Sequence, residues 1–177
     1  MSVFLANEQS QKTVDEVGLV ALARLVMEAE GVEEAEVSIL VVDRTVMTEL
    51  NTRYMGEEQP TDVLSFPIDG PLPASGPPEG PVGPRGPASD RLADDDDELE
   101  EGDDDAPWLL GDIVLCPSYA AEQAARAGQT LAAELELLTV HGILHLCGFD
   151  HAEPGEGDLM RERTDELLGR WRGRSRS

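Results

Sequence analysis

The chain has 177 residues, of which 40% are hydrophobic, and a formal net charge of -24 at pH 7. This length and apolar content suffice for one hydrophobic core, so we expect a single domain over residues 1–177. No stretch is long and apolar enough to cross a membrane, and the first eleven residues lack the basic leader of a signal peptide. Two cysteines do not make the disulfide framework of a small secreted protein. These features favour a cytoplasmic protein.

The negative charge is concentrated between residues 70 and 107. This segment carries twelve acidic residues against two arginines, a net charge of -10. Its first half is rich in proline and glycine and its second half is a run of acids, so neither half can bury enough apolar surface to offset the entropy of ordering. We predict a disordered insert over 70–107. The end of the chain has the opposite bias, because six of the thirteen basic residues follow position 160, and residues 170–177 form an Arg-rich tail.

Apolar periodicity predicts the elements on either side of this insert. Before it, in chain order, they are a strand over 3–6, a helix over 14–29, a strand over 36–42, a helix over 45–54 and a strand over 63–66. After it, they are a strand over 112–116, a helix over 117–127, a helix from the N-cap Thr130 to just before Gly148, and a helix over 158–168. This order predicts an α+β fold in which one small mixed β-sheet packs against helices.

The three histidines of the chain all lie within HGILHLCGFDH, residues 141–151. His141 and His145 are four residues apart on the predicted C-terminal helix, which places both imidazoles on one face about one turn apart. Gly148 lets the helix end and the chain reverse, so that His151 returns to the same ion. Three neutral imidazoles with a fourth position left to water make the open, catalytic form of a zinc site. The spacing therefore predicts one metal ion, although imidazole also suits nickel, iron and copper.

The spacing matches the zincin pattern H-E-x-x-H-x-x-G-x-x-H except that Gly142 replaces the general-base glutamate. Peptide hydrolysis loses its proton carrier with that residue. A metal that lowers the pKa of bound water to about 7 still supplies hydroxide for attack on another electrophile, such as a phosphodiester. We therefore predict a metal-dependent hydrolase and disfavour a peptide substrate.

Together with PTDVLSFP at residues 60–67 and GDIVLCP at 111–117, the histidine motif resembles the YbeY family of bacterial endoribonucleases. The resemblance covers the chain except the insert and the tail. It implies a zinc-dependent, single-strand-specific endoribonuclease that acts in ribosomal RNA maturation, at the 3′ end of the small-subunit RNA, and in ribosome quality control. It implies single-stranded RNA, small-subunit rRNA and the ribosomal subunit as partners, with a ribosomal protein or the GTPase Era as candidate protein partners. The family's three zinc ligands fall on His141, His145 and His151.

Two positions depart from the family pattern. Many members have an arginine after the aromatic residue that precedes PTDVLSFP, but here Met55 follows Tyr54. We do not transfer the arginine's role to Arg53, because residues two apart on a helix do not face the same way. Gln129 stands where relatives often have a histidine after Gly128, which leaves the ligand set at three.

Five further residues have both a functional and a structural interpretation. By the family resemblance, Thr61, Asp62 and Ser65 line a substrate groove beside the metal, whereas the structural interpretation is that they order the margin of a strand. Asp150 either orients a histidine or the bound water, or is a turn residue. Cys147 falls on the opposite side of the helix from the histidines, which favours a small core residue over a fourth ligand.

Three more residues are weighed in the same way. Glu134 lies seven residues before His141, and we expect an exposed first-turn acid that the helix dipole favours rather than a group that supports a ligand. Met160 is expected in the core rather than in a Met-turn. Trp171, among the arginines of the tail, either stacks on RNA or belongs to a frayed end.

Three classes of function remain, and RNA hydrolysis at the metal ranks first. The second is another metal hydrolase, such as a peptidase or amidase, which Gly142 disfavours. The third is a non-catalytic ribosome assembly factor with a structural metal, which the missing family arginine keeps open. A fourth protein ligand favours the third class, and an open, water-bearing position favours the first.

Overall fold

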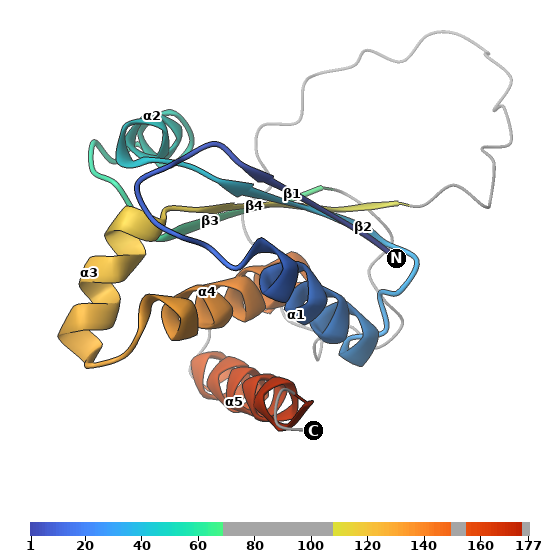
Figure 1. Cartoon of the computed structure of the whole chain (residues 1–177). Helices are drawn as coiled ribbons and strands as arrows, with labels where there is room; N and C mark the ends of the chain where they lie inside the picture. The colour runs from blue at the N-terminus through green and yellow to red at the C-terminus, as the bar shows by residue number, and fades with distance from the viewer. Residues whose placement is uncertain (69–107, 150–154, 175–177) are drawn as a thin grey trace, which may run out of the picture.

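The computed structural model describes residues 1–68, 108–149 and 155–174. These residues form one mixed four-stranded sheet and five helices, which confirms the predicted α+β class (Figure 1). The strands are β1 (Ser2–Asn7), β2 (Glu36–Val41), β3 (Val63–Pro67) and β4 (Leu109–Leu115). The helices are α1 (Glu16–Ala29), α2 (Arg44–Met55), α3 (Pro117–Ala127), α4 (Leu131–Leu146) and α5 (Glu156–Arg174). The predicted insert at 70–107 lies outside the described residues.

The strand order in the sheet is β1-β2-β4-β3. β1, β2 and β4 are parallel to one another, and β3 pairs with β4 in the antiparallel direction. Parallel neighbours need a long crossover, and α1 supplies the one between β1 and β2. The backbone N–H of Ile68 donates to the carbonyl of Leu110 at 3.2 Å, so the two described ends that flank residues 69–107 are adjacent.

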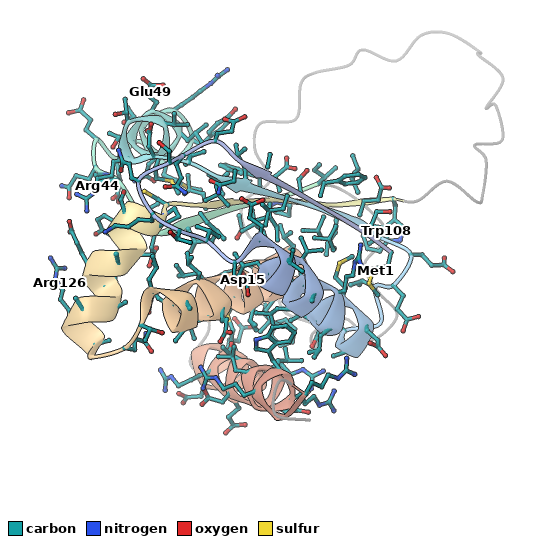
Figure 2. All side chains as sticks on the ribbon, in the orientation of Figure 1. Met1, Asp15, Arg44, Glu49, Trp108 and Arg126 are labelled. Atoms are coloured by element: carbon teal, nitrogen blue, oxygen red, sulfur yellow. The ribbon has the colours of Figure 1, made fainter. Side chains whose placement is uncertain are left out.

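The helices cover the two faces of the sheet unequally (Figure 1). α1 and α4 lie against one face, α5 packs on their outer side, α2 lies on the opposite face, and α3 stands at one end of the sheet. Side chains fill the space between the sheet and the helices on the α1 and α4 side, where the larger core lies (Figure 2). A smaller cluster beneath α2 contains Met47, Leu64 and Val114. Among the described residues, no helix has the length and apolarity that a membrane span requires.

The residue predicted to cap the histidine-bearing helix does so. Thr130 is the N-cap of α4, and its hydroxyl accepts a hydrogen bond from the backbone N–H of Ala133 at 3.2 Å. Gly128 ends α3 in the left-handed conformation, with φ of 69°, which a residue with a side chain adopts less readily. These two signals separate α3 from α4 and fix where the histidine-bearing helix begins.

The last helix is longer than the sequence predicted, because it runs to Arg174 rather than ending near Leu168. Trp171 packs against the larger core, and its indole N–H donates to Glu136 Oε1 of α4 at 2.9 Å. This contact holds the first part of the arginine-rich stretch in a docked helix, so the expectation of a frayed end is wrong for residues 170–174. The ring is half-buried, so it contributes to the packing of the fold.

Candidate metal centre

α4 carries the histidine pair and packs closely on the sheet. A Cβ atom at Gly142 would lie 3.1 Å from two side-chain carbons of the buried Ile113, in β4. One turn further along α4, the side chain of Leu146 also approaches β4. A Cβ at Gly111 of β4 would lie 2.7 Å from it. The glycine that replaces the zincin glutamate therefore has a structural reason. It allows the turn between the two histidines to approach β4.

His141 and His145 point their Nε2 atoms at each other, 3.0 Å apart, and their rings meet edge-on with centroids separated by 4.6 Å. The Nδ1 atom of His145 lies 2.8 Å from the carbonyl oxygen of Phe149. Since a carbonyl can only accept, His145 donates from Nδ1, and in the neutral ring its Nε2 is the atom that carries the lone pair. A backbone carbonyl that fixes the tautomer in this way is the usual support of a metal-binding imidazole.

The histidine pair fits a divalent metal ion. Two nitrogens bound to tetrahedral zinc at about 2.0 to 2.1 Å stand about 3.3 Å apart, and the observed separation of 3.0 Å is close to that value. The third predicted ligand, His151, and the candidate Asp150 lie outside the described residues. Within the described ranges no group of three metal-binding side chains is assembled.

β3 runs along the side of α4. Ser65 pairs with Ile113 in the sheet, and Ile113 packs against Gly142. Leu64 and Phe66 belong to the cluster beneath α2, so alternation along the strand turns the side chain of Ser65 toward the α4 face. Ser65 therefore lies on the same face of the sheet as the histidines, in register with the turn that joins them.

Thr61 and Asp62 order the start of β3. The hydroxyl of Thr61 donates to Asp62 Oδ1 at 3.2 Å, and the backbone N–H of Val63 donates to the same oxygen at 2.8 Å. These bonds agree with the structural interpretation of both residues. The surface between β3 and α4 is called the strip from here on. Asp62 is only half-buried, so it also places a carboxylate at the end of this strip, next to the start of β3.

Glu134 is buried, with 6% of its surface exposed, so the expectation of an exposed first-turn acid is wrong. The side-chain amide of Gln129 donates to Glu134 Oε2. Burial raises the pKa of the Glu134 carboxyl above its ordinary value, the hydrogen bond from Gln129 opposes that shift, and the charge of Asp62 adds to it. Glu134 and Asp62 thus bring two carboxyl groups near each other, two helical turns before His141.

Cys147 and Met160 are core residues, as predicted, with 2% and 1% of their surfaces exposed. Burial, helped by the charge of Glu30, raises the pKa of the Cys147 thiol to about 12. The thiol therefore remains protonated at neutral pH, and a thiolate is the form that binds metal.

Met55, which stands where many family members have an arginine, is the last residue of α2. The ring of Tyr54 meets Phe66 edge-on at 5.0 Å, and the guanidinium of Arg53 stands 5.4 Å from the centre of the Tyr54 ring. Phe66 belongs to the cluster on the α2 face of the sheet, opposite the histidines. The ring that Arg53 covers therefore packs on the face opposite the histidines, and the absence of the arginine's role from Arg53 stays a prediction. Arg44, also on α2 and labelled in Figure 2, pairs with Glu122 of α3.

The fold and the histidine pair define a single-domain α+β protein with a candidate metal centre between one helix and a sheet edge. The solution structure of TM1509 from Thermotoga maritima has the same fold, with a TM-score of 0.54 and 22% identity over 97% of this chain and 93% of that one. The family profile described as Endoribonuclease YbeY matches residues 4–172.

Curated relatives give the same result over nearly the whole chain. Proteins named Endoribonuclease YbeY are 47% identical in Frankia casuarinae (98% of this chain, 76% of the relative), 46% in Salinispora tropica (97% of each) and 45% in Mycobacterium tuberculosis (97% and 84%). The chain belongs to the YbeY endoribonuclease family.

Proposed function

We propose that this protein is a metal-dependent endoribonuclease that cleaves single-stranded RNA. The proposal rests on one observation above all. The Nε2 atoms of His141 and His145 converge to 3.0 Å on a helix that lies beside an edge strand. Membership of a family whose curated relatives are named endoribonucleases supplies the substrate class.

His141 and His145, with His151, are the residues proposed to hold a zinc ion. Phe149 fixes the tautomer of His145 through its carbonyl oxygen. When bound, zinc would supply Lewis-acid activation of water for attack on a phosphodiester. Gly142 offers no carboxylate, and a side chain added there would point at Ile113, so residue 142 does not take a proton from water.

We attribute the proposed preference for single-stranded RNA to the strip of surface between β3 and α4. Its side chains come from one edge strand and one helix. A rigid duplex presents two phosphate backbones, whereas an unpaired strand can bring one phosphodiester to the histidines and turn its other phosphates outward.

We extend the proposal to the cellular role that the family resemblance implies. That role is cytoplasmic maturation of ribosomal RNA, at the 3′ end of the small-subunit RNA, together with ribosome quality control. The ribosomal subunit, a ribosomal protein and the GTPase Era are the partners proposed on the same basis.

The test combines metal content with cleavage of matched RNAs. The purified protein should contain about one zinc ion per chain, cut an unpaired oligonucleotide and resist the same sequence in a duplex. Chelation should abolish cleavage, and added zinc should restore it. Bound metal without cleavage of any RNA would contradict the nuclease and favour an assembly factor with a structural metal. Metal-dependent cleavage of a generic peptide, with no action on RNA, would favour a peptidase.

A further inference from the structure

The outer edge of β3 carries backbone groups that point away from the sheet. Cys116 donates its backbone N–H to the carbonyl of Asp62 at 2.9 Å, and Ile68 donates to Leu110 at 3.2 Å. In an antiparallel ladder the hydrogen-bonded positions alternate, so the even-numbered residues of β3 bond to β4. The N–H and C=O groups of the odd-numbered residues face outward, where no other strand among the described residues pairs with β3.

These outward groups are mostly acceptors. The N–H of Val63 is already bonded to the side chain of Asp62, and Pro67 has no N–H. The carbonyls of Val63, Ser65 and Pro67 therefore stand beside a single outward donor, the N–H of Ser65. An RNA phosphate only accepts hydrogen bonds, so this edge matches it poorly. A ligand with its own N–H groups matches it better.

The negative charge next to this edge also favours a ligand other than RNA. Asp62 adjoins the first residue of β3, and its charge acts on the buried carboxyl of Glu134. No arginine or lysine of the described residues forms an ion pair with either carboxyl. The edge therefore combines outward-pointing carbonyls with the charge of the half-buried Asp62, and both favour a cationic ligand that donates hydrogen bonds.

We propose that the outer edge of β3 is a docking site for an extended, basic polypeptide segment of a partner protein. The segment would add antiparallel to β3 as a fifth strand. The backbone N–H of Ser65 would donate to a carbonyl of the segment, and the carbonyl of Ser65 would accept from an N–H of the segment. The carbonyls of Val63 and Pro67 would each accept a hydrogen bond from another N–H of the segment. Basic side chains of the segment would meet Asp62. The docking concerns binding alone, so it holds or fails independently of the nuclease activity.

The test uses a fluorescent eight-residue peptide of alternating lysine and threonine, whose binding to the full-length protein is followed by anisotropy. Its matched control is the same peptide with an N-methyl group on every backbone amide, which keeps the charge but removes the donors of both edges. Methylation should weaken binding about tenfold, because two or more hydrogen bonds are lost. Equal binding of the two peptides would show that charge alone attracts them, and the proposal would be wrong. Absence of binding by the unmethylated peptide would also overturn it.

Variants of the protein locate the contact. Ser65→Pro removes the one outward N–H and leaves the ladder to β4 intact, since edge strands tolerate proline where the N–H faces outward. It should weaken peptide binding about tenfold, whereas Ser65→Ala, which keeps the backbone, should bind within about twofold of wild type. Equal weakening by both variants would contradict a backbone contact. Circular dichroism checks that both variants fold.

A second measurement follows the Ser65 amide directly and needs no variant. In ¹⁵N-labelled wild-type protein, the lysine–threonine peptide should shift the Ser65 amide resonance and slow its hydrogen exchange. A single-stranded oligonucleotide that the enzyme cannot cleave should not slow the exchange of this amide, because RNA between β3 and α4 does not bond to the outward N–H. If the oligonucleotide slows the exchange of the Ser65 amide and the peptide does not, the edge binds RNA and the docking proposal fails.

Discussion

Gly142 approaches Ile113 so closely that a single methyl group on the glycine would lie 3.1 Å from two carbons of the isoleucine side chain. Ile113 is fully buried between the sheet and α4, so it has little room to yield. The position that most distinguishes this chain from a zincin protease is therefore also a packing position.

Gly142→Ala should lower the free energy of unfolding by about 1 kcal/mol, because overpacking of about 1 to 3 kcal/mol exceeds the gain in helix propensity of about 1 kcal/mol. Gly142→Glu should cost more and should not create a peptidase, since the new side chain starts against Ile113. Urea denaturation and a peptide cleavage assay measure the two effects. Gly169→Ala is the matched control, because the exposed Gly169 in α5 has open space around its missing Cβ and should gain stability. Equal stabilisation by both substitutions would contradict the packing argument.

His145→Ala removes one of the three proposed metal ligands and the hydrogen bond to Phe149. Metal affinity should fall by at least about a hundredfold, and RNA cleavage should fall with it. Zinc content by atomic spectroscopy and initial cleavage rates provide the readouts. A variant that kept both its metal and its rate would show that the metal assignment is wrong.

Glu134→Gln should change how stability depends on pH. Because the pKa of Glu134 is raised, the folded chain holds this proton more tightly than the unfolded chain does, and stability falls as pH rises from the ordinary value of about 4.3 through the raised one. Glutamine cannot lose the proton, so the stability of the variant relative to wild type should increase across that window and then level off. Urea titrations from about pH 4 to about pH 8 measure this difference. Glu162→Gln, at an exposed site on α5, controls for the change in net charge, and the same pH-dependent gain there would contradict the assignment.

Trp171→Phe should lower the free energy of unfolding by about 1 kcal/mol, because the indole hydrogen bond to Glu136 is lost while most of the packing remains. Affinity for single-stranded RNA should not change. Thermal denaturation and an RNA binding titration test the two statements together. A loss of RNA affinity at unchanged stability would show that Trp171 stacks on bases instead.

Excision of residues 70–106, with a short Gly/Ser linker, should leave a folded protein that still binds metal, because the ends of β3 and β4 are adjacent at Ile68 and Leu110. Removal of ten net negative charges should tighten RNA binding. The gain should shrink as the Debye length falls from about 10 Å at 0.1 M salt to about 3 Å at 1 M. Loss of folding or of metal would show that the segment is structural. Unchanged cleavage of naked RNA with weaker association with the ribosomal subunit would identify the acids as a docking surface.

The elements were predictable because their signals are local. The Thr130 cap, the Gly128 end and the four-residue spacing of the histidines each act within one or two turns. The burial of Glu134 was not predictable in this way, because the start of β3, far away in the sequence, contributes to its environment. The length of α5 was missed for a similar reason, since its last turns depend on the contact between Trp171 and Glu136 of α4.

The close fit at Gly142 lay beyond the sequence for another reason. A glycine that replaces a glutamate indicates a lost proton carrier, but only the packed sheet shows that there is no room for a side chain. The strand order was equally hidden, because nothing in the apolar pattern of residues 63–67 specifies that their partner is β4 rather than β2.

The position of β3 at the edge of the sheet also matters while the chain is being synthesised. β3 pairs only with β4 among the described strands, and β4 is not complete until residue 115 has been added. At roughly 5 to 20 residues per second, the ribosome needs a few seconds to pass from one strand to the other. During that time Leu64 and Phe66 have no sheet to pack on. The nascent chain therefore presents a strand without a partner, which is the kind of segment that chaperones bind and that aggregates when they do not.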